Sequence, residues 1–345
     1  AHIPVVTTMM GLGVMPSDDK MNLGMIGQFG NSAANYALNN NDLLIIIGAR
    51  VGDRAVTSPD KMAEKTRTIH IDIDPAELGK NMTHTVPLVG DVKNILIKLL
   101  AENPVADSAE WIEEVTERSE KEKHKISEKR PAGTVGPRNF MLELGKQLND
   151  DSYVVADVGQ NQIWAGKYIP VKNGRFLTSG GLGTMGYGFP AAIGAKIGNP
   201  DRTVIAISGD GGMQMNIQEF ATAVLEELPL ILCVFNNEYL GMVRQWQKLF
   251  YGKRYGMTNL RSGALFRRTN GEEMPEYTPD FVRLAESYGA KGIRVTKKEE
   301  IKEAFEEAGK NTTVPTLIEF IIDPEEMVYP MIKPGGTLEE MIVEC

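Results

Sequence analysis

Cysteine and histidine are scarce in this sequence of 345 residues, which has two cysteines and four histidines. Cys233 and Cys345 form neither a CxxC pair nor a disulfide framework, and this favours a reducing, cytoplasmic compartment. The histidines are scattered along the chain: His2, His70, His84 and His124. Because no HExxH motif occurs either, a metal site built from histidine is not expected.

Long apolar runs and an excess of positive charge are also missing. The longest apolar stretches, such as LLIIIGA at 43–49, are far too short to span a bilayer, so we expect no membrane segment. The net charge of −9 argues against nucleic-acid binding, because phosphate neutralisation needs clustered lysine and arginine. A hydrophobic content of 42% and a charged content of 24% are ordinary for a globular protein, and the length predicts two domains.

The chain opens with the apolar stretch AHIPVVTTMMGLG, without an initiator methionine and without the pattern of a signal peptide. From the residues alone, two interpretations stay open. Either a methionine was removed before Ala1, or the sequence starts inside a domain.

Residues 1–103 alternate helix and strand signals, which predicts a first α/β domain. Four segments carry these signals: a helix at 31–38 capped by Asn31 or Ser32, a buried parallel strand at 43–49, a strand at 67–74 and a helix at 94–102. Residues 104–137 are rich in charge and proline, and they predict an exposed, partly helical linker without a function of its own.

Residues 138–330 repeat the alternation and predict a second domain, followed by a C-terminal tail at 331–345. Strands are expected at 153–159, 203–208, 229–235 and 315–323, and helices at 213–228 and 279–288, the latter ended by Gly289. Thr296 and Glu299 predict a capping box for a further helix. The expected fold class is therefore α/β, with two domains that each form an open, mainly parallel sheet flanked by helices.

The stretch SGDGGMQMN places one carboxylate, Asp210, among glycines directly after the strand at 203–208. The strand at 229–235 runs into NNEYLGM, which contains Asn237. One helix and one strand separate the two residues, as in a right-handed βαβ crossover that brings both loops to one sheet edge. A turn explains either motif alone, but the combination at this spacing favours a ligand site.

An acid oxygen and an amide oxygen, completed by phosphate, suit Mg²⁺. Gly209, Gly211 and Gly212 allow the backbone to approach a diphosphate closely, and the following helix directs its N-terminus there. The residues therefore predict a magnesium–diphosphate site.

This combination resembles the thiamine diphosphate motif of thiamine-dependent enzymes. Longer segments resemble the catalytic subunit of acetolactate synthase, also called acetohydroxyacid synthase: SGGLGTMGYGFPAAIGA, GDGGMQMNIQEFATAVLEELPL and NNEYLGMVRQWQKLFY. IPVVTTMMGLG, GARVGDR and HIDIDPAELGKN are similar to the central domain of that family, and YPMIKPGGTLEEMI is similar to its tail. The resemblance covers nearly the whole chain.

The resemblance implies a transferase with thiamine diphosphate, Mg²⁺ and FAD as cofactors. Such an enzyme decarboxylates pyruvate and transfers the hydroxyethyl unit to a second 2-keto acid in branched-chain amino acid biosynthesis. The products are 2-acetolactate or 2-aceto-2-hydroxybutyrate. A homodimer or homotetramer is implied as well, and a small regulatory subunit is a further partner that the family allows.

The resemblance also implies roles for individual residues. Asp210, Asn237 and the backbone carbonyl of Tyr239 would hold Mg²⁺. Contacts with the thiamine cofactor would fall on Gln160, Asn161, Gly183, Gly209, Gly211, Gly212 and Met242. Met185 would be the apolar wedge under the bent cofactor, unless it is simply a core methionine in a glycine-rich turn. Trp246 would shape the pocket for the second substrate.

The central domain of the family holds FAD, which does no net redox work. The matching positions here are Gly27, Arg50, Asp53, Arg54, Asp72 and Asp91. Arg54 would also face the substrate carboxylate, which suits a bidentate guanidinium. Asp72 has the alternative reading of a strand-end acid that caps a turn.

The sequence departs from the family pattern mainly at the FAD positions. Val51 and Gly52 replace a phenylalanine and an aspartate, and Gln28 and Phe29 replace a Met-His pair. Asn161 stands where a histidine is common.

Nothing in the chain matches the N-terminal domain of the family, which carries the glutamate that activates the cofactor. In that family the thiamine site lies between this domain of one subunit and the diphosphate domain of another. We therefore expect half a site, and little or no activity from this chain alone. Two other functions stay open: another thiamine-dependent carboligase or decarboxylase, and a catalytically silent cofactor-binding module.

Overall fold

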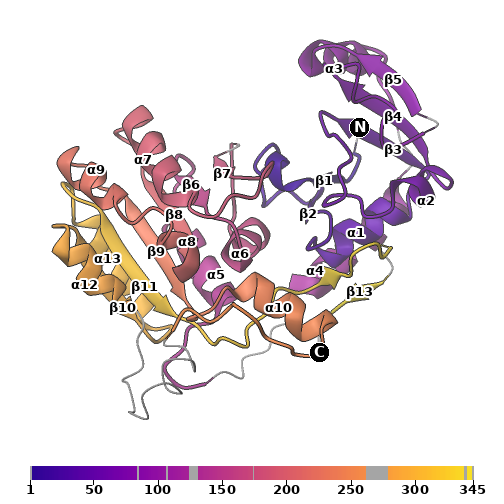
Figure 1. The fold of residues 1–345 in the computed structure, drawn as a ribbon. Helices are drawn as coiled ribbons and strands as arrows, with labels where there is room; N and C mark the ends of the chain where they lie inside the picture. Colours follow the sequence, from indigo (N-terminus) through magenta and orange to yellow (C-terminus); the bar gives the residue numbers. More distant parts are fainter. Residues whose placement is uncertain are drawn as a thin grey trace. The chain divides into compact units, whose positions relative to one another are not determined.

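The chain forms two α/β units in the computed structural model (Figure 1). The first unit comprises Ala1–Ser127 with Tyr329–Cys345, and the second comprises Glu128–Val328. The structure describes residues 2–83, 85–105, 108–123, 131–173, 175–261, 279–337 and 340–343. His84, His124 and Cys345 lie outside these residues, as do residues 106–107 and 124–130 of the charged segment.

The first unit contains two parallel sheets and one antiparallel strand pair. Its strands are β1 (Val5–Thr7), β2 (Asn22–Met25), β3 (Leu43–Ile47), β4 (Arg67–Asp72), β5 (Thr85–Val89), β12 (Met331–Ile332) and β13 (Met341–Ile342). β1 pairs with β2, β3–β4–β5 form a parallel sheet in that order, and β12 pairs with β13 antiparallel. Its helices are η1 (Met9–Gly11), α1 (Ser32–Asn39), α2 (Pro59–Ala63), α3 (Val92–Ala101) and α4 (Ala109–Lys123).

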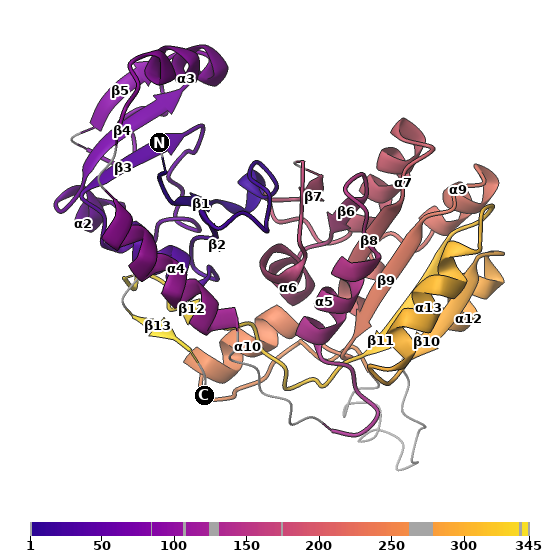
Figure 2. The same ribbon diagram turned by 180° about the vertical axis from the view of Figure 1, so that it is seen from behind.

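The second unit is built on a six-stranded sheet in the order β10-β11-β9-β8-β6-β7, in which every pair is parallel (Figure 2). Its strands are β6 (Tyr153–Ala156), β7 (Phe176–Thr178), β8 (Val204–Gly209), β9 (Ile231–Asn236), β10 (Lys291–Val295) and β11 (Thr316–Ile321). Its helices are α5 (Pro137–Gln147), α6 (Gln160–Tyr168), α7 (Gly188–Gly198), α8 (Asp210–Met213), α9 (Glu219–Leu225), α10 (Gly241–Phe250), α12 (Phe281–Ser287) and α13 (Glu300–Gly309). The expected α/β class with parallel sheets is confirmed.

Side chains alternate between the two faces of this sheet, because successive residues of a strand point in opposite directions. On one face, Val234 of β9 and Leu317 of β11 join a buried apolar cluster with Phe189 of α7, Phe220 of α9 and Phe281 of α12. The apolar stripes of these helices therefore cover that face.

The opposite face of the sheet carries an aromatic cluster. Phe140 of α5 lies with its ring centroid 4.8 Å from that of Phe235 and 4.3 Å from that of Phe320. Phe305 of α13 adds a fourth ring, 6.0 Å from Phe140. Helices thus cover both faces, and the edges at the strand ends are left for loops.

The continuous helix expected over 213–228 is wrong. α8 ends at Met213 and α9 begins at Glu219, and Leu225, an apolar residue of the expected helix, is 80% exposed. Between the helices, Glu219 N donates to Asn216 O and Phe220 N donates to Ile217 O. These hydrogen bonds join residues three apart, as in a 3₁₀ turn. An apolar period does not distinguish such tight turns from an α-helix.

The segment 104–137 contains more packed structure than an exposed linker has. Val115 of α4 is fully buried in a cluster with residues of α1 and β2. The Glu122 carboxylate of α4 accepts the N–H of Ser32, the first residue of α1, at 2.9 Å. Asn31 makes no side-chain cap there, so a distant glutamate replaces the expected local cap.

Two smaller expectations also differ from the structure. The strand at 43–49 is not fully buried, because β3 is an edge strand of the described sheet and Leu43 and Ile47 are 43% and 44% exposed. Before α13, the carboxylate that accepts the Thr296 N–H belongs to Glu300 rather than Glu299. In the part of the chain that the structure describes, no helix has both the length and the apolarity to cross a membrane.

Replacing Phe140 tests the aromatic core. Phe140→Ala is expected to lower the free energy of unfolding by about 3–5 kcal/mol. Removing one of the four packed rings leaves a cavity that the other three rings cannot fill. Leu225→Ala, at an exposed position of α9, is the control and should change stability by less than about 0.5 kcal/mol. Urea denaturation followed by circular dichroism measures both, and equal effects of the two substitutions would contradict the assigned core.

Candidate functional site

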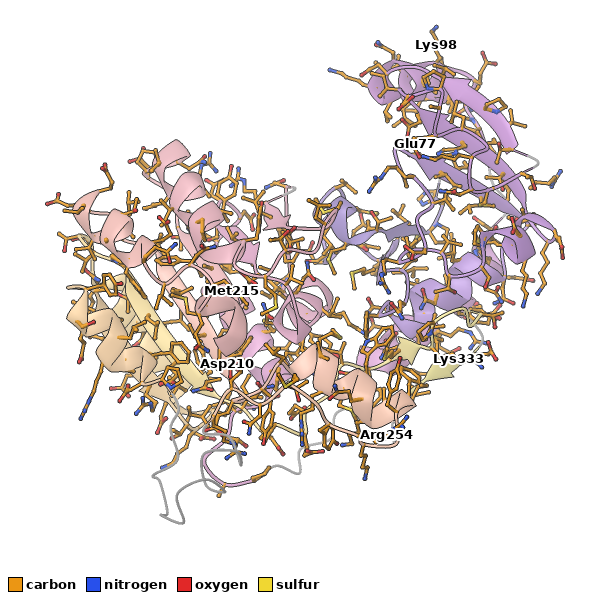
Figure 3. All side chains as sticks on the ribbon, in the orientation of Figure 1. Glu77, Lys98, Asp210, Met215, Arg254 and Lys333 are labelled. Carbon is orange, nitrogen blue, oxygen red and sulfur yellow. The ribbon has the colours of Figure 1, made fainter. Side chains whose placement is uncertain are left out.

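The carboxyl ends of β8 and β9 meet at one edge of the six-stranded sheet. The two strands are parallel neighbours, with Gly209 opposite Phe235. Asp210 and Asn237 follow these strands directly, so both leave the sheet at the same edge, and the expected crossover is confirmed. Figure 3 labels Asp210 at the start of α8.

The Asp210 carboxylate is buried and only partly hydrogen-bonded. Its side chain is almost inaccessible, Oδ1 accepts the N–H of Gly211 at 2.9 Å, and Oδ2 is buried without a hydrogen-bond partner. Burial raises the pKa of this carboxyl to about 7, although the N–H groups of Gly211 and Glu238 counteract part of the effect. An unpartnered carboxylate oxygen inside a protein is costly, and a cation would compensate it.

The loop after β9 is shaped by its own side chains. Asn236 Oδ1 accepts the N–H of Glu238 at 3.1 Å, and Asn237 Oδ1 accepts the N–H of Tyr239 at 3.0 Å. Glu238 has a φ of 62°, a left-handed conformation that a glutamate adopts only when its surroundings impose it. This turn presents the Asn237 side chain and the Tyr239 backbone at the edge where Asp210 lies.

A second segment clamps the same loop. Leu240 N donates to Thr258 O at 2.8 Å, and Leu260 N donates to Glu238 O at 2.9 Å. The guanidinium of Arg261 lies 3.0 Å from the Glu238 carboxylate. The oxygens of the turn are therefore held in place before any ligand binds.

Two of the glycines that follow Asp210 leave no room for side chains. A Cβ on Gly211 would lie 2.7 Å from Leu240 Cδ2 and 3.3 Å from Met185 Cε, and one on Gly212 would lie 2.6 Å from Asp157 Oδ1. Met185 and Leu240 thus lie against the start of α8. For Gly209 the nearest atom would be 3.6 Å away, and Gly183 is exposed with a φ of 64°, so space does not require glycine at either position.

Gln160 and Asn161 begin α6 after Gly159, whose φ is 137°. The Gln160 amide already donates to Gln245 Oε1 at 2.9 Å and to the carbonyl of Glu326 at 3.0 Å. The Asn161 amide donates to the carbonyl of Asp157 at 2.8 Å. Phosphate binding by these residues stays a prediction. Because their side-chain amides already have partners, the N–H groups of the first helical turn are better placed to bind a phosphate.

Asp157 belongs to the candidate site as well, and it is not among the residues expected from the sequence. This buried carboxylate accepts the N–H of Gly186 at 3.1 Å and of Gly188 at 2.7 Å, one on each oxygen. Burial raises its pKa despite these bonds. Met185 lies on a glycine-rich loop. The Asp157 carboxylate attaches this loop to the end of β6 through the two hydrogen bonds. The available signal was an acid directly after a strand, the same pattern that identified Asp210.

α10 starts directly after the Asn237 loop and carries Met242 and Trp246. Both side chains are half-buried, and the Trp246 ring packs edge-on against Phe250 with centroids 5.6 Å apart. This places both residues near the same sheet edge. The role of Trp246 in a substrate pocket stays a prediction.

In the first unit, the carboxyl ends of β3, β4 and β5 bring Arg50, Asp72 and Asp91 to one edge of their sheet. Asp72 Oδ1 accepts the N–H of Asp74 at 2.9 Å, and Asp91 Oδ1 caps α3 by accepting the N–H of Asn94 at 3.0 Å. The alternative reading of Asp72 as a turn-capping acid is confirmed. Both carboxylates thus have local structural roles.

Gly27 and Arg54 are in direct contact. Gly27 has a φ of 115°, and a Cβ there would lie 2.2 Å from the carbonyl oxygen of Arg54. The exposed Arg54 donates from Nη1 to Gln28 Oε1 at 2.7 Å, and its neighbour Asp53 is exposed as well. Gln28 also donates to the carbonyl of Ile332, so it connects this loop to the C-terminal tail.

The described residues contain no group of three or more His, Cys, Asp or Glu side chains that could hold a metal ion. A cation at Asp210 would therefore need amide and carbonyl oxygens of the neighbouring turn and oxygens of a ligand. Few protein ligands, all oxygen, completed by phosphate, are typical of Mg²⁺.

Comparison with known proteins assigns the family. Residues 157–320 match the family model described as thiamine pyrophosphate enzyme, C-terminal TPP binding domain, and residues 1–99 match the one described as thiamine pyrophosphate enzyme, central domain. The first range contains Asp157, Asp210 and Asn237. The chain belongs to the thiamine pyrophosphate enzymes.

Its relatives are named more specifically. A probable acetolactate synthase large subunit of Methanocaldococcus jannaschii is 43% identical over 99% of this chain and 56% of its own length. The acetolactate synthase large subunit of Corynebacterium glutamicum is 41% identical over 97% of this chain and 53% of its length. That of Haemophilus influenzae is 37% identical over 99% and 58%. The chain spans about half the length of the curated relatives it matches.

The pKa of Asp210 predicts how pH affects stability without metal. The pKa rises from 3.8 to about 7 on folding, so between these values the folded chain keeps a proton that the unfolded chain has lost. The free energy of unfolding therefore falls as pH rises, by up to about 1.4 kcal/mol per unit, and levels off above about 7. Asp210→Asn removes this titration while preserving shape.

Urea denaturation of both proteins in EDTA, from about pH 4 to 8, measures the effect. The stability of the natural protein relative to Asp210→Asn should decline with rising pH. A difference that does not vary with pH would contradict the buried, unpartnered carboxylate.

Proposed function

We propose that this chain supplies the Mg²⁺–diphosphate half of the active site of an acetolactate synthase. The observation that carries the proposal is the buried, unpartnered Oδ2 of Asp210 beside the fixed turn of Asn237 and Tyr239. The names of relatives that match nearly the whole chain support the same reaction.

The Asp210 carboxylate, Asn237 Oδ1 and the carbonyl of Tyr239 would hold Mg²⁺, and the diphosphate would complete its ligands. A divalent cation next to Asp210 favours the ionised carboxylate, which burial alone disfavours. The buried Oδ2, which has no hydrogen-bond partner among the described residues, therefore fits a metal ligand better than a structural acid.

The organic cofactor would lie over the same sheet edge. When bound, thiamine diphosphate supplies a carbon nucleophile that breaks and forms bonds next to a keto group. Met185 lies against α8, on the loop that Asp157 holds in place, and its side chain would pack against the cofactor. The backbone of Gly183 would contact the cofactor as well. Further contacts would come from Gln160, Asn161, Gly209, Gly211, Gly212 and Met242.

The reaction proposed for the whole enzyme is the combination of two 2-keto acids with loss of one CO₂. Two pyruvates give 2-acetolactate, and pyruvate with 2-ketobutyrate gives 2-aceto-2-hydroxybutyrate. Trp246 would contact the second keto acid. In the first unit, the guanidinium of Arg54, once released from Gln28, would suit a substrate carboxylate. Branched-chain amino acid biosynthesis requires these products.

FAD is proposed for the first unit on position alone. Arg50, Asp72 and Asp91 lie at the carboxyl edge of a parallel sheet, where dinucleotides bind in such folds, while Gly27 and Asp53 lie on neighbouring loops. No buried unpartnered atom among them points to a ligand, so FAD has weaker structural support than Mg²⁺.

The name "large subunit" of the relatives supports a small regulatory subunit as a partner, together with a homodimer or homotetramer. Because the relatives extend well beyond this chain, the proposal includes a partner surface that completes the cofactor site. The chain alone is then expected to bind poorly and to turn over little pyruvate.

Asp210→Ala tests the metal assignment in the complete enzyme. We expect thiamine diphosphate affinity in the presence of Mg²⁺, measured by calorimetry, to fall at least about 30-fold, the cost of removing a charged ligand partner. The control is Asp201→Ala, at an exposed turn before β8, which should leave affinity unchanged. Unchanged affinity of Asp210→Ala would show that the metal lies elsewhere.

Product analysis distinguishes the candidate functions. With pyruvate and 2-ketobutyrate, the complete enzyme should release 2-acetolactate and 2-aceto-2-hydroxybutyrate, and the isolated chain should release almost none. Acetaldehyde as the main product would identify a decarboxylase instead. Cofactor binding without turnover by the complete protein would identify a silent binding module.

A further inference from the structure

A second buried carboxylate lies close to the proposed metal loop and has no role in it so far. Glu319 of β11 is 1% exposed, and β11 is the neighbour of β9. Its Oε1 accepts a hydrogen bond from Asn236 Nδ2 at 2.7 Å, and its Oε2 accepts one from Arg294 Nε at 2.7 Å. The charge is therefore paired and both oxygens have partners.

Asn236 transmits this contact to the loop. It is the last residue of β9, and its Oδ1 accepts the N–H of Glu238, the residue with the left-handed backbone. A carboxylate accepts hydrogen bonds only, so Glu319 requires the nitrogen of the Asn236 amide to face it. The oxygen of that amide must then face the Glu238 N–H. Glu319 thus fixes the orientation of the group that closes the turn.

Arg294 anchors the outer end of the network. It lies on β10 opposite Glu319 and also donates from Nη2 to Asp280 Oδ1 at 2.7 Å. The hydrogen bond to Glu319 raises the pKa of the Arg294 guanidinium. Asp280 in turn caps α12 by accepting the N–H of Arg283 at 3.2 Å. The line from Asp280 to Asn236 therefore crosses three adjacent strands.

The register of the sheet explains why this line is continuous. Glu319 is opposite both Arg294 on β10 and Val234 on β9, and Asn236 is two residues beyond Val234. Residues two apart on a strand share a face, so these side chains lie on the face covered by α9 and α12. Apolar residues occupy this face elsewhere, among them Leu317.

We propose that Glu319 is a positioning residue for the metal loop, acting through Asn236 to fix the turn that presents Asn237 and Tyr239. The inference rests on the proposed function, because it assumes that this turn holds Mg²⁺. The pair joins a buried carboxylate to a guanidinium whose side chain is 43% exposed. Such an ion pair adds little net stability compared with apolar side chains, so stability alone does not account for it. Partners that orient metal ligands change metal affinity about 10- to 100-fold when replaced.

Exchanging the polarity of the pair tests the proposal. In Glu319→Gln, the two accepting oxygens of the carboxylate become one oxygen and one NH₂ group. The NH₂ group then faces a second donor, either the Asn236 amide nitrogen or the Arg294 guanidinium. In Asn236→Asp, two carboxylates face each other. In the double variant, the new glutamine donates to the new aspartate and accepts from Arg294, and the aspartate still accepts the Glu238 N–H.

The measurement is the Mg²⁺ concentration that gives half-maximal binding of thiamine diphosphate to the complete enzyme. Glu319→Gln should raise it about 10- to 100-fold, and the double variant should return it to within about threefold of the natural protein. Glu307→Gln, on the exposed side of α13, is the control and should have no effect. Thermal melting without metal, recorded in parallel, reports any purely structural effect.

Three results would overturn the proposal. One is a lower melting temperature of Glu319→Gln with an unchanged Mg²⁺ requirement, which marks a structural role only. Another is tighter Mg²⁺ binding by Asn236→Asp alone, because the rescue would then reflect added charge. The third concerns Asn236→Ala, which serves if Glu319→Gln does not fold, because it keeps the Arg294–Glu319 pair. An unchanged Mg²⁺ requirement in Asn236→Ala would contradict the mechanism.

The outcome for the natural protein separates this inference from the proposed function. If the natural enzyme binds no thiamine diphosphate with Mg²⁺, both are wrong. If it binds and every variant binds equally well, only the positioning role of Glu319 is wrong.

Discussion

The parallel pairing of β8 with β9 is the constraint on which the rest of the site depends. It brings the residues that follow two distant strands to one sheet edge, where Asp210 and the Asn237 turn lie together. Strand burial on both faces fixes the register, because a slip by one residue would turn Val234 away from its cluster. The apolar core therefore determines the position of polar groups that contribute little to stability themselves.

The polar groups at this edge are supported in layers. Asp210 is left with an unpartnered oxygen, whereas the groups around it are fully engaged: Asp157 with the amides of the glycine-rich loop, and Glu319 with Asn236 and Arg294. This contrast has a physical meaning. Fully bonded buried carboxylates hold backbone segments in place, and the incompletely bonded one is available to a ligand. Rigid surroundings also reduce the entropy that a ligand must overcome on binding.

The sequence predicted the fold class and the meeting of Asp210 with the Asn237 loop, because both follow from apolar strands at crossover spacing. It did not predict the break between α8 and α9, since tight turns preserve the apolar period. The roles of Glu122, Glu300 and Asp157 were also missed. Each accepts backbone N–H groups, and the choice among nearby or distant acids depends on packing that a linear pattern does not contain. The Glu319 network needs three strands in register and is visible only in the folded chain.

A crystal structure of the complete enzyme with thiamine diphosphate and Mn²⁺ in place of Mg²⁺, with the metal located by its anomalous scattering, tests the central claim most directly. We predict one metal ion in contact with a carboxylate oxygen of Asp210, Oδ1 of Asn237, the carbonyl oxygen of Tyr239 and the diphosphate. A metal ion bound to the diphosphate without contact to Asp210 or Asn237 would contradict the account.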